Sequence, residues 1–327
     1  MNKIDFVITW VDDNDPKWIK EFNKYFPDNI NVDTNNKRYR SWENLQYWFR
    51  GVEKFSPWVN KIHFVTYGHI PRWLNTKHPK LNIVKHEQYM RKENLPVFNS
   101  HPIEVNLHRI KDLADQFVLF NDDTFIVNEI SSTRFFKNGL PCDIAVNNVV
   151  DFSGIEHILV NNLAIINKYF IKKQVIKSNI LKWFSFRYKL HLAKTLFLLP
   201  WKQITGFFDP HQAQPYLKST FCDVWNLEKE VLKQTSKSKF RSSHDVNQYL
   251  FRYWQLMRAN FEPISISDSK LIVLHTIDDC EIFSTIAHRY KLVCLNDEVG
   301  DDEFDTAKNI INKVFSDIFP EKSSFEI

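Results

Sequence analysis

The sequence predicts an α/β fold in which a mostly parallel central sheet is flanked by helices. Over the first 125 residues, short apolar runs typical of buried strands alternate with apolar residues at helical spacing. Two of these strand-like runs end in clusters of acidic residues, at the place where ligands bind in such sheets. With 327 residues, 43% of them hydrophobic and 25% charged, the chain has the composition of a globular protein with a substantial core.

The expected elements follow one another closely in the first part of the chain. Apolar runs rich in β-branched and aromatic residues predict strands at residues 5–11, 61–67, 81–85 and 116–120. Apolar side chains three and four residues apart predict a helix over residues 42–55, with Ser41 as its N-cap. A second such stripe predicts a helix over residues 103–117, opened by Pro102, which continues directly into the fourth strand.

Charge is unevenly distributed along the chain and divides it into four segments. Residues 1–156 form the first part of the α/β core, and residues 209–299 form the remainder. Between them, residues 157–208 contain nine Lys and Arg, no Asp or Glu, and many aromatic residues, which predicts a basic helical insertion. Residues 300–327 begin with acidic residues and continue as an amphipathic helix.

The basic insertion has two alternative interpretations. Its interleaved aromatic residues suit an anionic membrane interface better than a DNA groove, so we expect no nucleic-acid partner. Alternatively, the insertion docks on the protein's own acidic surface. The four cysteines are widely spaced, and MNKIDFVITWVDD lacks the apolar stretch of a signal peptide. We therefore expect a cytoplasmic protein, at most peripheral at the inner face of the membrane.

Glycine is scarce, with six residues in the whole chain and no two within a dozen positions of each other. This spacing excludes the GxGxxG dinucleotide fingerprint and the GxxxxGK[ST] phosphate loop. Any bound phosphate must be held by side chains, helix ends or a metal ion.

Acidic clusters follow three of the expected strands. They contain Asp12, Asp13 and Asp15, then Asn121, Asp122 and Asp123, and finally Asn296 and Asp297 after an apolar run at residues 291–295. Adjacent carboxylates repel one another unless a cation lies between them, and carboxylate oxygens suit Mg²⁺ or Mn²⁺. The clusters therefore predict a metal-assisted nucleotide-diphosphate site. The alternative is that Asn and Asp simply form turns.

Four segments resemble the conserved blocks of the Stealth family of sugar-phosphate transferases. DFVITWVD at residues 5–12 resembles the first block, and residues 40–123, beginning RSWENLQYWF and ending VLFNDD, resemble the long second block. Weaker matches begin at His211 (HQAQPYLKSTF), extending to Asp245, and at Cys294. The resemblance implies a GT-A-like core in which residues 1–156 bind a nucleotide sugar.

The resemblance also implies a reaction, namely transfer of a hexose-1-phosphate or N-acetylhexosamine-1-phosphate from a nucleotide-diphosphate sugar, expected to be UDP-linked. The acceptor would be a hydroxyl of a free or lipid-linked glycan, in synthesis of a bacterial capsular or cell-surface polysaccharide, and the nucleoside monophosphate would leave. Two alternatives stay open: an ordinary glycosyltransferase that releases UDP, and a non-catalytic carbohydrate-binding protein.

By the same resemblance, His211 is the candidate general base, since an imidazole titrates near neutral pH. Asp122 and Asp123 are the expected metal ligands, and Asp123 is alternatively the group that orients the acceptor. The residues expected to contact the donor or substrate are Thr9, Trp10, Asp12, Asp15, Arg50, Glu104, His108, Arg109, Asn121, Arg241 and Asp245. Among these expected contacts, Arg50, Arg109 and Arg241 would clamp the diphosphate, since guanidinium groups match phosphate oxygens. Trp10 would stack on the nucleotide or pack beneath it. Glu104 and His108 are four residues apart and would share one face of the helix opened by Pro102. Each of these residues also has an ordinary interpretation as a packing or surface residue.

Overall fold

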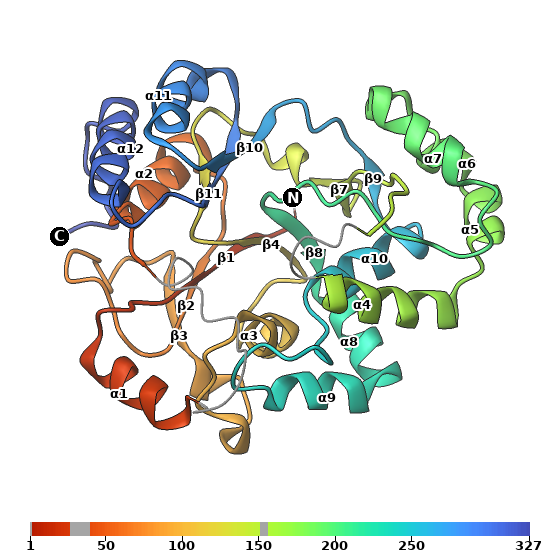
Figure 1. Ribbon diagram of the computed structural model, residues 1–327, viewed down its shortest axis with the longest axis horizontal. Coiled ribbons are helices and arrows are strands. Elements are labelled where there is room, and N and C mark those ends of the chain that lie inside the picture. Colours follow the sequence, from red (N-terminus) through yellow and green to blue (C-terminus); the bar gives the residue numbers. More distant parts are fainter. Residues whose placement is uncertain (1, 27–39, 151–155) are drawn as a thin grey trace.

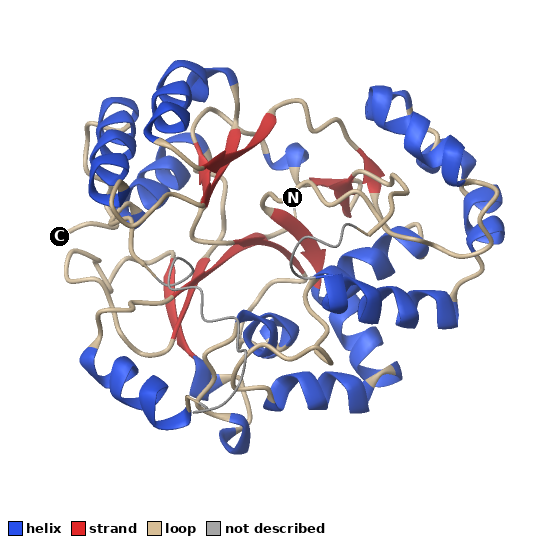
Figure 2. Cartoon of the chain, in the orientation of Figure 1, coloured by secondary structure: helices blue, strands red, loops and turns tan. Residues whose placement is uncertain are grey.

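A computed structural model describes residues 2–26, 40–150 and 156–327 and is built around a five-stranded sheet (Figures 1 and 2). The strand order is β3-β2-β1-β4-β8. Strands β1 (Ile4–Trp10), β2 (Ile62–Thr66), β3 (Leu81–Lys85) and β4 (Gln116–Phe120) run parallel, and β8 (Gln214–Leu217) is antiparallel to β4. The predicted α/β class with a mostly parallel sheet is confirmed.

The central strands are mostly apolar because the sheet is covered on both faces, and the buried Asp5 of β1 and His63 of β2 pair with each other at 3.0 Å. Alternate side chains of β1 enter different cores: Val7 belongs to one buried cluster, whereas Phe6 and Ile8 belong to the other. The first cluster is covered by helices that follow β3 or β4 in the chain: α3 (Ser100–Val105), α4 (Glu156–Tyr169), α8 (Lys218–Leu227), α9 (Lys229–Lys237) and α10 (Tyr249–Met257). The opposite face is covered by α2 (Leu45–Phe55), α11 (Ile277–Ile286) and α12 (Phe304–Ile318). A further helix, α1 (Pro16–Tyr25), follows β1 directly.

A second, three-stranded sheet brings the carboxyl-terminal part of the chain to the end of β4. Its order is β10-β11-β5, with β10 (Ser269–Leu274) parallel to β11 (Leu292–Asp297) and β5 (Thr124–Ile126) antiparallel to β11. The backbone N–H of Leu295 donates to the carbonyl of Asp123 at 2.9 Å. The strand predicted at residues 291–295 therefore exists, but it belongs to this sheet, and it ends beside the acidic turn that follows β4.

Gly51 allows α2 to lie close to β5. A Cβ atom at this position would be 2.3 Å from the carbonyl oxygen of Ile126. The absence of a side chain at Gly51 thus helps to fix the strand that leaves the acidic turn. Three short strands, β6 (Phe136–Lys137), β7 (Leu140–Asp143) and β9 (Glu262–Pro263), complete the sheets of the described residues.

Two predicted helices differ from the structure. The helix expected over residues 103–117 ends at Val105, and a short 3₁₀ turn at Leu107–Arg109 follows. Leu107, Ile110 and Leu113 are nevertheless buried, so the apolar spacing was produced by turns rather than by a helix. The helix expected from residue 42 begins at Leu45, and the Ser41 hydroxyl accepts from the backbone N–H of Glu43 instead of capping the helix.

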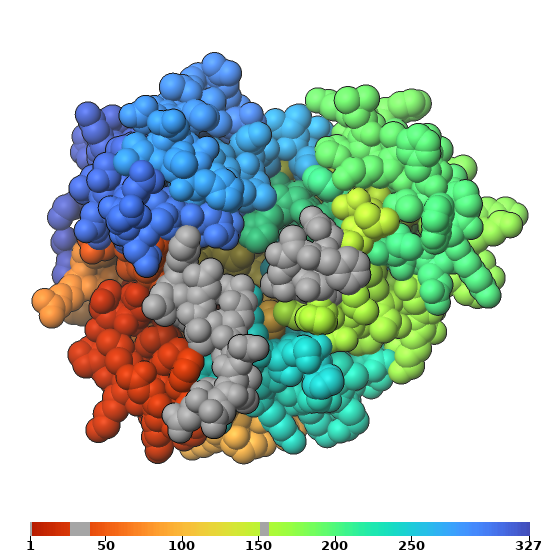
Figure 3. All heavy atoms as spheres, viewed as in Figure 1, coloured from red at the N-terminus to blue at the C-terminus, as the bar shows by residue number. Residues whose placement is uncertain are grey.

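The predicted insertion at residues 157–208 is divided between core and surface. Helix α4 is part of the first buried cluster, through Leu163, Ile165 and Ile166. Residues 170–203, which we call the arm, contain α5 (Lys172–Ser178), α6 (Ile180–Trp183), a 3₁₀ segment (Phe186–His191) and α7 (Leu192–Leu198). The arm forms one edge of the molecule, shown in green in Figures 1 and 3. Within the described residues, no helix has the length and apolar character needed to cross a membrane.

Candidate active site

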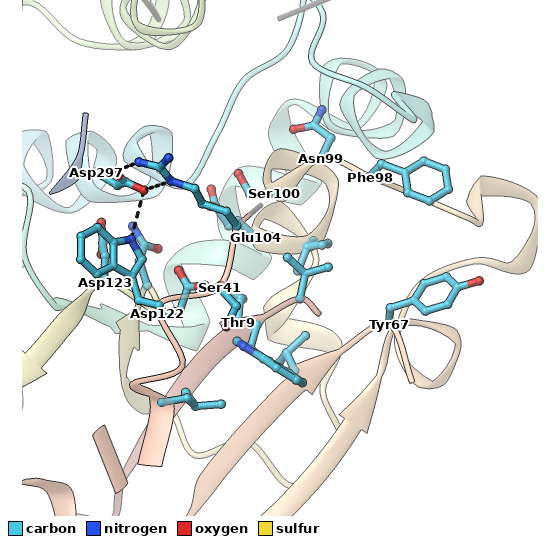
Figure 4. A pocket seen from close by; sticks show the side chains of 18 of the residues that line it. Thr9, Ser41, Tyr67, Phe98, Asn99, Ser100, Glu104, Asp122, Asp123 and Asp297 are labelled. Carbon is cyan, nitrogen blue, oxygen red and sulfur yellow. Dashed lines mark hydrogen bonds and ion pairs between the residues drawn. The ribbon is translucent and has the colours of Figure 1, made fainter. Parts of the chain in front are cut away.

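A cavity of about 480 Å³ opens at the carboxyl ends of β1 and β4. The strand order changes direction between these neighbours, since β2 lies beside β1 on one side and β8 lies beside β4 on the other, and α/β proteins bind ligands at such a point. Figure 4 shows Asp122, Asp123 and Asp297 on one side of the cavity and Phe98 and Asn99 on another. The fold thus gathers strand ends and the start of α3 around one space.

The turn after β4 places two adjacent carboxylates in this cavity. The Asp122 side chain is exposed to the cavity, and protein atoms surround the turn that carries it. Desolvation, together with the neighbouring charge of Asp123, raises the pKa of Asp122 to about 7. The Thr124 hydroxyl donates to Oδ1 of Asp123 at 2.9 Å, and the other carboxylate oxygen, Oδ2, faces His211.

His211 lies on the open side of that carboxylate. Its Nε2 atom is 3.9 Å from Oδ2 of Asp123, which is longer than a hydrogen bond but close enough for electrostatic coupling. Both side chains are partly exposed to the cavity. His211 has a φ of 44°, in the left-handed region that a residue with a Cβ seldom adopts, so the surrounding structure must hold it there.

A buried ion cluster behind His211 provides that support. The fully buried guanidinium of Arg252 donates twice to Asp143, at 2.9 Å each, and also to Asp209. The hydroxyl of Tyr253 donates to Asp209 as well. Desolvation raises the pKa of Asp209 to about 6, although Arg252 and Tyr253 act in the opposite direction. Because Asp209 precedes His211 by two residues, helix α10 anchors the segment that presents the imidazole.

Asp297, at the end of β11, differs from the acidic turn because it is neutralised by an ion pair. Arg40 donates to both of its carboxylate oxygens, and the indole N–H of Trp42 donates to it at 3.1 Å. The Arg40 guanidinium also donates to the carbonyl of Val299 at 2.8 Å and lies over the Phe304 ring. Asp297 therefore lines the cavity as a paired carboxylate, and Figure 4 shows its bonds as dashed lines.

Most of the expected site residues from strand ends lie in the cavity. The predicted residues that line it are Thr9, Trp10, Glu104, Asn121, Asp122, Asp123, His211 and Arg241. Trp10 was expected either to stack on the nucleotide or to pack beneath it. Its ring packs against Phe64 and His69, with ring centres 5.5 and 5.1 Å apart, and also borders the cavity.

A second cavity of about 370 Å³ adjoins the first, and Tyr67 and His86 line both. Asp15 lines this second cavity and also caps α1, accepting from the backbone N–H of Trp18 at 2.7 Å. Asp12 lines neither cavity; its backbone N–H donates to Nε2 of His69 at 2.8 Å. His86 is almost fully buried, and its Nδ1 atom has no hydrogen-bond partner among the described residues.

Arg50 does not reach the cavity, contrary to its expected role as a diphosphate clamp. Its guanidinium forms a two-pronged ion pair with Glu326, at 2.8 and 2.7 Å, and donates to the carbonyl of Phe319 at 2.8 Å. The reason is its position on α2, on the side facing the carboxyl-terminal segment. Arg50 thus ties this segment to the core.

His108 and Arg109 also lie outside the cavity. The prediction placed His108 one helical turn after Glu104, but α3 ends at Val105, so that relation does not exist. His108 packs against the Phe221 and Trp225 rings, and burial lowers its pKa to about 3. The Arg109 guanidinium lies 4.2 Å above the centre of the Trp225 ring.

Asp245, expected to contact the substrate, is buried and lines neither cavity. Its carboxylate accepts from Asn99, His101, Ser238 and the backbone of Ser242. These bonds hold the loop that carries Arg241 against the start of α3. Asp245 therefore acts on the cavity only through its neighbours.

Sequence reasoning missed several cavity residues. The missed residues include Arg40, Ser41, Trp42, Tyr67, His86, Phe98, Asn99 and Ser100, whereas Asp297 had been expected only as part of the third acidic cluster. Most of them lie in the segment that resembles the second Stealth block, which was the available signal. Nothing in the local pattern separated them from the packing residues of the same segment.

The donor set around Asp123 fits a hard metal ion only in part. In the described parts of the chain, one group of possible ligands comes together: Asp123, His211 and Cys294, with ligand atoms within 4.8 Å of one another. Burial raises the pKa of the Cys294 thiol well above its usual value, so this sulfur is a poor ligand for a hard cation. The carboxylates of Asp122 and Asp123 do fit Mg²⁺ or Mn²⁺, which commonly bind one or two carboxylates and complete their shell with water and phosphate oxygens.

Comparison with known proteins identifies the family. Conserved region 1 of Stealth proteins matches residues 2–26, conserved region 2 matches residues 38–143, and conserved region 4 matches residues 284–327. The matches include the resemblances predicted at residues 5–12, 40–123 and 294–297, whereas the one at residues 211–245 stays a prediction.

Similar proteins align along the whole chain. A capsular polysaccharide phosphotransferase WcwK of Streptococcus pneumoniae is 44% identical over all of this chain and 98% of its own length. A receptor polysaccharide phosphotransferase WefC of Streptococcus gordonii is 37% identical over the full length of both. The solved structure of the bifunctional glycosyltransferase WbbM has a TM-score of 0.38 at 9% identity, covering 98% of this chain and 52% of that one. From the three matched regions and the full-length relatives, we conclude that the chain belongs to the Stealth family.

Proposed function

We propose that this protein transfers a sugar-1-phosphate from a nucleotide-diphosphate sugar, expected to be UDP-linked, to a hydroxyl of a glycan. The product would be a phosphodiester-linked capsular or cell-surface polysaccharide of a bacterium. The observation that carries the proposal is the approach of the His211 imidazole to Asp123 in the cavity at the strand ends. The full-length relatives named as polysaccharide phosphotransferases support the same reaction class.

The two adjoining cavities suggest where the donor lies. The smaller one, bordered by Asp15, His69 and Lys85, follows the ends of β1, β2 and β3 and has room for the nucleoside. The diphosphate would then pass Tyr67 and His86 and reach the larger cavity near Asp122 and Asp123. Arg241, in the same cavity, is the candidate guanidinium for a phosphate oxygen.

His211 would act as the general base. The acceptor hydroxyl transfers its proton to the imidazole while its oxygen forms a bond to the phosphorus nearest the sugar. The bond from this phosphorus to the oxygen of the nucleoside monophosphate breaks, and that oxygen leaves with the electron pair. Because the sugar's C1–O bond is untouched, the anomeric configuration of the donor is kept in the product.

Asp122 and Asp123 would hold Mg²⁺ or Mn²⁺. Such a cation, when bound, offsets negative charge on the phosphate oxygens. The two adjacent carboxylates repel each other without a cation, and the raised pKa of Asp122 reflects desolvation together with this repulsion. Asp123 therefore has two proposed tasks, namely cation binding and electrostatic support of a protonated His211.

Identification of the leaving group tests the proposal against ordinary glycosyl transfer on the same site. Purified protein would be incubated with UDP-sugars and defined glycan acceptors, followed by chromatography of the nucleotides and ³¹P NMR of the product. We expect UMP and a new phosphodiester signal. Release of UDP with a phosphorus-free product would contradict the proposal and support the glycosyltransferase alternative.

A matched pair of variants distinguishes UMP release by this protein from UMP release by a contaminating enzyme. His211→Ala should abolish UMP release, whereas His78→Ala, which changes a histidine bonded to Ser324 outside both cavities, should leave it unchanged. No turnover in any protein would instead favour a carbohydrate-binding role. We also propose a cytoplasmic location, because the four cysteines are all free thiols.

A further inference from the structure

The arm at residues 170–203 carries an unusual number of exposed apolar side chains. Among the described residues, the four most exposed large apolar side chains all belong to it. These are Phe186 at 94%, Leu190 at 91%, Leu181 at 86% and Phe197 at 78% of their full exposure. Leaving such side chains in water is unfavourable, and a cluster of them marks an interaction surface.

Buried anchors fix the direction of these side chains. Leu181 is two residues from the buried Trp183, and Phe197 is two residues from the buried Thr195. Two residues correspond to about 200° around an α-helix, so each exposed side chain points away from the core. The Thr195 hydroxyl accepts from the backbone N–H of Asn147 at 3.0 Å, which ties α7 to the core.

The 3₁₀ segment between α6 and α7 repeats this arrangement. Phe186 and Leu190 flank the buried Tyr188, whose hydroxyl donates to the carbonyl of Lys182 at 2.7 Å. Exposed Ile180 and Trp201 extend the apolar surface at either end of this region. The arm is therefore a supported structure that presents apolar side chains outward.

The charged groups of the arm are all basic and fall into two sets. Lys172 and Lys182 point inward and donate to backbone carbonyls, Lys182 to those of Ala259 and Phe261 at 2.8 and 2.7 Å. The outward set is exposed and forms no ion pair with a described acidic residue; it consists of Lys173, Lys177, Arg187, Lys189, Lys194 and Lys202. The expected docking of this basic segment on the protein's own acidic surface is thus limited, in the described residues, to Lys168 and Glu228.

We propose that the arm docks the protein on an anionic lipid bilayer. Apolar side chains would enter the boundary between headgroups and acyl chains, and the six basic groups would lie among anionic headgroups. Trp201 suits the interface because its ring has an apolar body and a polar N–H. A second copy of the chain is a poorer partner, because a symmetric contact through this surface would place six positive charges opposite six others.

Vesicle binding of the full chain tests the proposal. Vesicles of phosphatidylcholine alone would be compared with vesicles containing 30% phosphatidylglycerol (roughly the anionic fraction that gives a strong surface potential). Sedimentation would be measured at about 0.1 M and about 0.5 M salt. We expect at least tenfold tighter binding to the anionic vesicles, and a marked loss of binding at the higher salt concentration.

Variants separate the two components of the surface. Phe186→Ser with Leu190→Ser should weaken binding to anionic vesicles at least tenfold. Lys173→Gln, Lys177→Gln and Lys194→Gln together should weaken it by about 100-fold, since each basic group near the surface contributes roughly a factor of five. The control is Leu227→Ser with Ile282→Ser, which changes exposed apolar residues outside the arm and should leave binding unchanged.

Thermal unfolding and size-exclusion chromatography with light scattering complete the test. Unchanged Tm values would show that a loss of binding is not a loss of folding. Equal binding to neutral vesicles, no binding to either kind, or equal effects of the arm and control variants would overturn the proposal. A dimer that Phe186→Ser with Leu190→Ser converts to a monomer would also overturn it, by assigning the surface to a second copy. UMP release is independent of this outcome, so failure here leaves the proposed reaction untouched.

Discussion

Two acidic strand ends border the same cavity, and they differ in how their charge is balanced. At the end of β11, Asp297 is paired with Arg40 and bonded to Trp42. At the end of β4, Asp122 and Asp123 are adjacent, and their proximity contributes to the raised pKa of Asp122. The comparison teaches that an acidic strand end becomes a candidate catalytic group where no described arginine or lysine pairs with it, as Arg40 pairs with Asp297.

Asp123→Asn should have the largest effect on activity. It removes the carboxylate next to His211 and a proposed cation ligand, so we expect UMP release to fall by about 1,000-fold, within the range for loss of acid–base catalysis. Its stability should change by less than about 0.5 kcal/mol, because the substitution also relieves repulsion at Asp122. Steady-state kinetics and thermal unfolding of the same preparation measure both quantities.

This prediction fails if Asp123→Asn unfolds the protein or keeps more than a tenth of the activity. Either result would make the turn after β4 a structural turn, the ordinary interpretation of Asn-Asp-Asp.

Arg252→Met should have the largest effect on stability. It leaves Asp143 and Asp209 without their buried cation, which costs about 3–5 kcal/mol of unfolding free energy. Urea denaturation would measure the loss.

Tyr253→Phe is the milder companion, and it should cost about 1 kcal/mol because it removes one hydrogen bond to Asp209. If the cluster positions His211, this folded variant should show a lower kcat with little change in KM for the donor. An unchanged kcat would assign the cluster to stability alone.

Asp297→Asn should reverse the pattern seen for Asp123→Asn. The loss of the charge leaves the mostly buried Arg40 with the carbonyl of Val299 and the exposed Asp301, so we expect a loss of about 1–3 kcal/mol of stability. Activity should fall by less than about tenfold when measured well below the Tm. Equal catalytic losses in the two Asp→Asn variants would remove the distinction between the strand ends.

The sequence predicted the parts of this arrangement that depend on local pattern. Strands β3 and β4 have the predicted bounds, and β1 and β2 differ by one residue at each end, because buried parallel strands are continuous apolar runs. Asn121, Asp122 and Asp123 were found because ligands gather where such strands end. By contrast, the pairing of Arg40 with Asp297 joins residues 257 positions apart, and no local pattern encodes it.

Residues on helices were less predictable, because their partners also lie far away in the sequence. Arg50 and Arg109 carry the guanidinium that suits a phosphate site. In the structure, Arg50 instead forms an ion pair with Glu326, and Arg109 lies over the Trp225 ring. Residue type and resemblance predicted guanidinium groups at the phosphates, but the direction of each side chain depends on how α2 and α3 pack. The early end of α3 was enough to displace His108 and Arg109 from the cavity.

Cation binding should depend on pH through Asp122. Desolvation and the Asp123 charge raise the pKa of Asp122 to about 7, so a proton competes with the proposed cation below this pH and ceases to compete above it. The apparent affinity for Mn²⁺ should therefore increase by about tenfold between pH 6 and pH 8, as the ionised fraction of Asp122 rises. Titration calorimetry would measure this, with EDTA-treated protein as the starting material.

Asp122→Asn is the control for the pH dependence, and it should bind Mn²⁺ more weakly and equally at both pH values. A pH dependence that persists in Asp122→Asn would assign the titration to another group. The same experiment on Asp297→Asn should retain the wild-type pH dependence, because Arg40 already neutralises that carboxylate.

Arg50→Ala should have the smallest effect on activity, and Arg241, which lines the cavity, is the arginine to compare with it. Arg50 binds Glu326 and Phe319 rather than the cavity, so its loss should change kcat and KM by less than about twofold while lowering stability by about 1–2 kcal/mol. Arg241→Ala, which removes the guanidinium that lines the cavity, should raise the donor KM or lower kcat by at least tenfold. Both variants would be compared at a temperature where they are folded. If Arg50→Ala impaired turnover as strongly as Arg241→Ala, the carboxyl-terminal segment that Arg50 holds would have to influence the shape of the cavity. The packing of α2 through Gly51 onto β5, the strand that leaves the acidic turn, is the contact through which it would do so.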